Sequence, residues 1–217
     1  MAQRSPWVKA LVGAVVLAAV VVLFLRSVQS TRSAPFVVER SSVTGWTLVE
    51  QPQGDSQGSW LGLRPPERLA PPLGREIFSR GAESLSFPTP PVMPLLLRRE
   101  FDAAFAGTVM PGAILDLARS AGLESAAPTP RCMGFRRISE PGGTRSVYFL
   151  LFEAPQFDDF RRRLAEMQRA AGGDALRFDA AALSPVLIVA SNDGEDGRWM
   201  PLRADPAADC LAPVELE

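Results

Sequence analysis

The 217-residue chain contains no histidine, and its one lysine is Lys9. Without histidine there is no base for a Ser-His-Asp or Cys-His nucleophile and no imidazole ligand for zinc. Because Lys9 lies in an apolar N-terminal segment, the rest of the chain lacks the lysine of a P-loop, a Ser-Lys dyad or a Schiff base. These absences favour a protein without catalytic activity, and we assign no catalytic residue, metal ligand or cofactor.

The N-terminal segment contains the longest apolar run of the chain. Residues 7–25 are apolar apart from Lys9, and no acidic residue interrupts them. A helix needs about 20 such residues to cross a bilayer, and a lysine near its end can extend its ammonium to the headgroups. We therefore expect residues 1–33 to form a membrane anchor that contacts lipid over 7–25.

The same segment has features of a cleaved secretory signal. A charged start and an apolar run precede Val28 and Ser30, two small residues with the spacing of a signal-peptidase site. We favour the uncleaved anchor, because the apolar region of a signal peptide usually covers only about 7–15 residues. Basic residues on the two sides of the run nearly balance, so charge alone does not determine its orientation.

The two cysteines, Cys132 and Cys210, lie far apart in the chain, and no C-x-x-C motif is present. Two thiols without histidine cannot complete a structural zinc site. We expect them to form a disulfide, which is typical of oxidising compartments. The pair favours a single-pass protein of the inner or cytoplasmic membrane with a periplasmic C-terminal domain.

The charge of the chain after residue 33 bears on its partners. Four of the 23 basic residues precede residue 34, which leaves 19 basic residues against 24 acidic ones and a net charge of −5. A net negative charge disfavours nucleic acid and anionic membrane surfaces as partners. We expect no nucleic-acid binding.

Composition divides the rest of the chain into three segments. Residues 34–63 are predicted to be a short β-rich segment. Residues 64–94 are rich in proline and are predicted to be a linker or a strap over the surface, with room for a short helix. Residues 95–217 are predicted to form an α+β globular domain. The expected strands of the first segment are 36–39, 46–50 and 60–63.

Apolar spacing predicts the elements of the C-terminal domain. The expected helices are 95–105, one that begins at Pro111 and one that begins at Pro155. The expected strands are 131–139, 146–153, 186–190, 199–203 and 210–214. The second arm of the 131–153 hairpin is apolar on both faces, which indicates an interior strand. Together these elements predict an α+β fold in which an antiparallel or mixed sheet packs with helices, preceded by the N-terminal transmembrane helix.

The hairpin carries the densest group of basic residues. Arg136, Arg137 and Arg145 lie on it with Tyr148 nearby. Guanidinium groups can bind an anionic ligand through paired hydrogen bonds. Strand alternation, however, places Arg136 and Arg137 on opposite faces, and pairing with strand-edge acids such as Glu153 is the alternative. These four residues are the candidate ligand-binding site.

Three functions fit these observations. The leading hypothesis is a membrane-anchored, extracytoplasmic α+β domain that acts through protein contacts, as an accessory or assembly component of the cell envelope. The second is a domain that binds a small anionic ligand. The third is a hydrolase that uses two facing carboxylates. The acids available for that reaction are Glu100, Asp102, Glu153 and Glu166.

Overall fold

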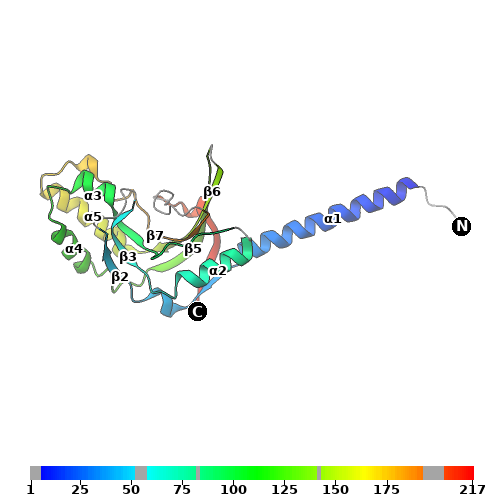
Figure 1. The fold of residues 1–217 in the computed structure, drawn as a ribbon, viewed down its shortest axis with the longest axis horizontal. Helices are drawn as coiled ribbons and strands as arrows, with labels where there is room; N and C mark the ends of the chain where they lie inside the picture. Colours follow the sequence, from blue (N-terminus) through cyan, green and yellow to red (C-terminus); the bar gives the residue numbers. More distant parts are fainter. Residues whose placement is uncertain (1–5, 52–57, 82–83, 141–142, 193–202) are drawn as a thin grey trace. The chain divides into compact units, whose positions relative to one another are not determined.

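The structure is a computed structural model of the chain, and it describes residues 6–51, 58–81, 84–140, 143–192 and 203–217. The chain divides into two compact units, Met1–Ala34 and Pro35–Glu217 (Figure 1). Apart from Ala34, the three segments expected after residue 33 lie within the second unit.

The first unit contains one helix, α1 (Pro6–Ser33). Its part Gly13–Thr31 is long and apolar enough to cross a membrane, judged by length and composition. A signal sequence can have the same properties. The helix extends past the apolar run, and residues 26–33, which follow Leu25, are helical as well.

The described residues of the second unit contain two sheets. The larger has the strand order β1–β8–β5–β6–β7 and is mixed, because β1 runs parallel to β8 whereas the other pairs are antiparallel. The smaller has the order β2–β3–β4 and is antiparallel. The strands are β1 Phe36–Val38, β2 Thr47–Glu50, β3 Ser59–Arg64, β4 Met93–Leu97, β5 Thr129–Glu140, β6 Gly143–Glu153, β7 Val186–Ser191 and β8 Cys210–Leu216. The α+β class and the mixed sheet agree with the prediction.

Strand β6 is buried on both faces. On one face Tyr148 and Leu150 belong to the main core. On the other face Val147 and Phe149 belong to a second apolar cluster that includes Ile188 of β7. The presence of apolar residues on both faces therefore predicted correctly that this strand is interior, since β5 and β7 pair with its two edges.

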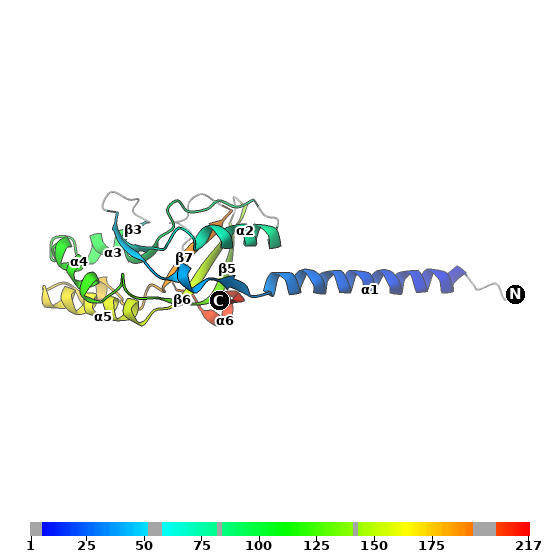
Figure 2. The ribbon, with the colours of Figure 1, turned by 90° about the horizontal axis from the view of Figure 1, so that it is seen from below.

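Helices pack around the two sheets. They are α2 Ala70–Gly81, α3 Arg98–Ala104, α4 Pro111–Ser120, α5 Pro155–Ala170 and α6 Pro206–Asp209, with 3-10 turns at Arg40–Val43 and Ala175–Arg177. Figures 1 and 2 show α3, α4 and α5 gathered at one end of this unit, whereas α2 contacts β7. The predicted helix starts at Pro111 and Pro155 are confirmed, because proline occupies the first helical position in both.

The predicted helix 95–105 is wrong at its start. Residues 95–97 belong to β4, where they are buried, and Leu96 and Leu97 pair with β3. The helix begins at Arg98, and the Glu100 carboxylate accepts a hydrogen bond from the backbone N–H of Leu97 at 2.9 Å. Three consecutive apolar residues fit a helix face and a buried strand equally well, so spacing alone did not separate the two.

The proline-rich stretch 64–94 contributes regular structure to the core. Helix α2 buries Leu73 and Ile77, and Met93 at the start of β4 is fully buried. Segment 84–92 also reaches β7, because Ser86 and Ser191 exchange backbone hydrogen bonds of 2.6 and 2.9 Å. The short helix expected here is present. Of the predicted strand 199–203, residues 199–202 lie outside the described residues.

Candidate functional site

The sheet separates the four predicted ligand-binding residues into two pairs. In the β5–β6 register Arg136 lies opposite Val147, and Arg145 lies opposite Ile138, so Arg136 and Arg145 share one face. Arg137 and Tyr148 lie on the other face. Tyr148 is 8% exposed and packs against Phe135, with ring centroids 4.8 Å apart. Ligand binding by these residues stays a prediction, and the geometry does not gather all four around one cavity.

Arg136 is held by a carboxylate from the C-terminal part of the chain. Its Nε and Nη2 donate to the two oxygens of Asp209 at 3.1 and 2.6 Å, and Nη2 also donates to the carbonyl of Arg203 at 2.9 Å. Burial raises the pKa of Asp209, but the hydrogen bonds from Arg136 and from the N–H of Asp205 lower it. The net result is a pKa below the ordinary value of 3.8. This pair joins β5 to the end of α6, directly before β8.

Three of the acids considered for hydrolysis face arginines. Glu100 lies 2.7 Å from Arg161, and Asp102 lies 3.2 Å from Arg98. Arg131 and Glu153 are 3.6 Å apart, which is the strand-edge pairing considered as the alternative to ligand binding. Within the described part of the chain, no group of three or more Cys, Asp or Glu residues is arranged to hold a metal ion.

The cysteines occupy neighbouring strands of the larger sheet. Cys132 of β5 and Cys210 of β8 lie at disulfide distance, with Cα atoms 5.7 Å apart. Their sequence separation is 78 residues, so the pair links the C-terminal strand to the middle of the unit. The predicted pairing agrees with this arrangement.

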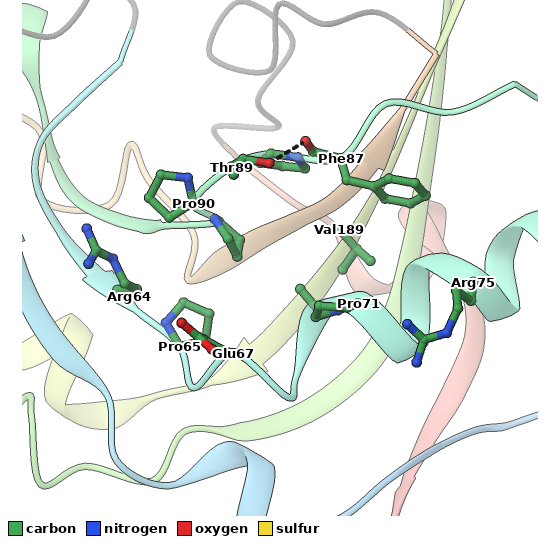
Figure 3. Close-up of a pocket in the computed structure, with 12 residues that line it drawn as sticks. Arg64, Pro65, Glu67, Pro71, Arg75, Phe87, Thr89, Pro90 and Val189 are labelled. Atoms are coloured by element: carbon green, nitrogen blue, oxygen red, sulfur yellow. Dashed lines mark hydrogen bonds between the residues drawn. The ribbon is translucent and has the colours of Figure 1, made fainter.

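A cavity of about 630 Å³ opens beside α2 (Figure 3). It lies between the β3–α2 connection, the first turns of α2 and the segment 87–91, and Val189 of β7 also lines it. Its volume is within the range of about 300–1,000 Å³ that is typical of ligand pockets. We call it the proline pocket, because five of its lining residues are prolines. They are Pro65, Pro71, Pro88, Pro90 and Pro91.

The proline pocket has rigid apolar walls. Phe87 is 49% exposed, and its ring lies against Gly74 of α2, where a Cβ atom would come within 2.5 Å of Cε1 of the ring. Glycine at position 74 therefore permits Phe87 to pack on the helix. Val189 is 1% exposed. Prolines have a fixed φ and no N–H, so these walls are preformed and present few hydrogen-bond donors.

Charged side chains surround these apolar walls. Arg64 at the end of β3 and Arg75 of α2 lie on opposite sides of the pocket in Figure 3, with Glu67 between them. All three are exposed. Among the residues that the structure describes, neither guanidinium has an ion-pair partner. The charged lining therefore has two cations for one anion.

Sequence reasoning did not identify the proline pocket. The density of prolines indicated an irregular segment, and this was the one available signal. The cavity forms because the segment 87–91 lies opposite the β3–α2 connection and near β7, elements that are distant in sequence. No local pattern encodes that arrangement.

The chain was compared with protein-family models, curated proteins and solved structures, and none of the three comparisons found a match.

Proposed function

We propose that this protein is a membrane-anchored accessory or assembly component of the cell envelope. Its α+β unit works outside the cytosol, through contacts with a partner protein. The observation that carries this proposal is the combination of an apolar helix of membrane-spanning length with a compact unit of residues 35–217.

The chemistry of the second unit supports binding over catalysis. The chain has no histidine, and its one lysine precedes this unit. Three of the candidate carboxylates are paired with arginines, Glu100 at 2.7 Å, Asp102 at 3.2 Å and Glu153 at 3.6 Å. What the surface offers instead is the proline pocket and exposed apolar side chains such as Phe78 and Met110.

The cysteine pair supports an extracytoplasmic compartment. Disulfides form and persist in oxidising environments such as the periplasm, and cytosolic thiols are usually kept reduced. Cys132 and Cys210 lie at bonding distance. A single-pass topology with the second unit on the oxidising side accounts for both the helix and the cysteine pair.

The anchor and its orientation are tested in the native host. We expect the protein to remain in membranes after carbonate extraction, with an intact N-terminus by mass spectrometry. Alkaline phosphatase fused after Glu217 should be active, and a cytosol-dependent reporter fused there should be inactive. A mature chain that begins near residue 31 would instead show a cleaved signal, and an active cytosolic reporter would contradict the proposal.

The partner is tested by photo-crosslinking in intact cells. The crosslinker is placed at exposed positions, which are Phe78, Thr89, Met110 and Leu176. We expect at least one position to yield a discrete adduct with one envelope protein, identified by mass spectrometry. Absence of any adduct from all four positions, together with a monomer by native mass spectrometry in detergent, would contradict the proposal.

A further inference from the structure

We propose that the proline pocket binds an extended peptide segment of the partner protein, with an aromatic or aliphatic side chain in the cavity and acidic residues on either side. This inference rests on the proposed function and names the chemistry that the binding surface recognises. It follows from the walls of the pocket, from the charges around it and from their separation.

The walls select an apolar group. The prolines and Phe87 present ring carbons, and the proline nitrogens have no hydrogen to donate. A polar group placed against these rings would leave water and find no donor in them, which is unfavourable. An aromatic or aliphatic side chain loses no such bonds. Because the proline rings are already fixed, little conformational freedom is lost when it binds.

The charges select acidic neighbours. Arg64 and Arg75 are exposed, and neither has an ion-pair partner among the described residues. A guanidinium binds a carboxylate with two parallel hydrogen bonds, which gives direction as well as attraction. Among the described residues of the lining Glu67 is the one acid against two arginines, so the ligand that complements the charge of the pocket is an anion.

The separation of the two arginines favours a peptide over a small acid. Figure 3 shows Arg64 and Arg75 on opposite sides of the pocket, with apolar walls between them. A compact molecule with one carboxylate would engage one guanidinium. An extended chain can place an apolar side chain in the cavity and an acidic side chain two residues away on either side at each guanidinium, because residues i and i+2 of an extended chain point to the same face.

The test uses a random heptapeptide display library. The full-length protein is held in phosphatidylcholine nanodiscs, and empty nanodiscs remove lipid binders. We expect the enriched peptides to combine an aromatic or aliphatic residue with Asp or Glu. The strongest is synthesised with a fluorescein label, and its affinity is measured by fluorescence polarisation.

Matched variants locate the binding. The variant Arg64→Glu/Arg75→Glu should raise the Kd of the labelled peptide about tenfold or more, because the charge-assisted hydrogen bonds to the two arginines are lost. The control Arg99→Glu/Arg169→Glu makes the same change of charge at exposed positions of α3 and α5 and should bind within about twofold of the unchanged protein. Thr89→Trp places a large side chain at the pocket and should also weaken binding. Unchanged thermal unfolding shows that each variant is folded.

Several results would overturn the inference. They are an absence of enrichment over empty nanodiscs, enriched peptides without acidic residues, and equal affinity for the pocket variant and the control. Decanoate serves as a small apolar acid in calorimetry. If it binds in an Arg64- and Arg75-dependent manner while no peptide is enriched, the pocket recognises small acids and the peptide proposal is wrong.

Failure here is distinguishable from failure of the proposed function. If the envelope partner still forms its photo-adducts in the Arg64→Glu/Arg75→Glu variant, the partner binds elsewhere and only the pocket assignment is wrong. If the unchanged protein forms no adduct, the proposed function itself is contradicted.

Discussion

Arg161 of α5 and Glu100 of α3 form a buried ion pair. Nη2 of Arg161 lies 2.7 Å from Oε1 of Glu100, and Nη1 lies 3.2 Å from Oε2. The remaining N–H groups donate to the carbonyls of Leu95, Asp179 and Ala180 at 2.8 to 3.0 Å. Every guanidinium hydrogen of this fully buried side chain therefore has an acceptor. The pair joins α5, the β4–α3 junction and the 179–180 loop.

Replacing Arg161 with methionine should strongly destabilise the protein. The change leaves Glu100 as a partly buried charge without its cation and leaves three carbonyls without that donor. Removal of one partner of a buried ion pair costs about 3–5 kcal/mol. The free energy of unfolding in urea measures this loss.

Arg162→Met is the matched control, because Arg162 is the next residue of α5 and pairs with Asp159 at the surface. An exposed pair contributes about 1 kcal/mol or less. A similar decrease in the free energy of unfolding for the two variants would contradict the role assigned to Arg161.

Breaking the Cys132–Cys210 link should lower stability. A link that closes a loop of 78 residues restricts the unfolded chain, and the loop-entropy model gives about 4 kcal/mol. We expect the free energy of unfolding in urea to fall by similar amounts in Cys132→Ala, Cys210→Ala and the double variant, since each breaks the same bond. A dithiothreitol-dependent shift in gel mobility, absent from all three variants, checks the bond. No difference between the oxidised and reduced protein would contradict this prediction.

Asp209 should contribute stability that disappears in acid. Its pKa lies below 3.8 in the folded protein, so the unfolded chain binds the proton more readily. Asp209 makes its full contribution to the free energy of unfolding above its pKa in the unfolded chain. This contribution is lost as the pH falls through its lower pKa in the folded protein. Asp209→Asn should therefore be less stable than the unchanged protein at neutral pH, and the difference should shrink as the pH falls below about 4.

The measurement is the free energy of unfolding across this pH range. Asp116→Asn serves as the control, because Asp116 is an exposed acid of α4 whose pair with Arg119 is at the surface. A constant difference between Asp209→Asn and the unchanged protein at all pH values would count against the Arg136–Asp209 pair.

Gly134 of β5 should not tolerate a side chain. A Cβ atom at this position would overlap the ring of Phe149, and that ring is fully buried. Overpacking of a core costs about 1–3 kcal/mol, so Gly134→Ala should lower the thermal unfolding temperature. Gly112→Ala in α4 is the control, because no atom apart from its chain neighbours and the backbone of its own helix lies within 4 Å of its added Cβ. That change should be neutral or stabilising, and equal effects of the two would refute the packing argument.

Sequence pattern was sufficient where a local property decides the outcome. The apolar run predicted α1, Pro111 and Pro155 predicted two helix starts, and the apolar residues on both faces of β6 predicted an interior strand. In each case the residues themselves carry the physical cause. An uncharged run can enter lipid, proline suits the first turn of a helix, and apolar residues on both faces require cover on both sides.

Tertiary structure decided the rest, because those outcomes depend on which distant segments meet. It placed 95–97 in a strand beside β3, divided the predicted arginines between two faces and brought Asp209 to Arg136. It also turned a proline-rich segment into the walls of a pocket near β7. Short apolar runs and isolated charges have no intrinsic partner, so burial and pairing across the chain determined their roles.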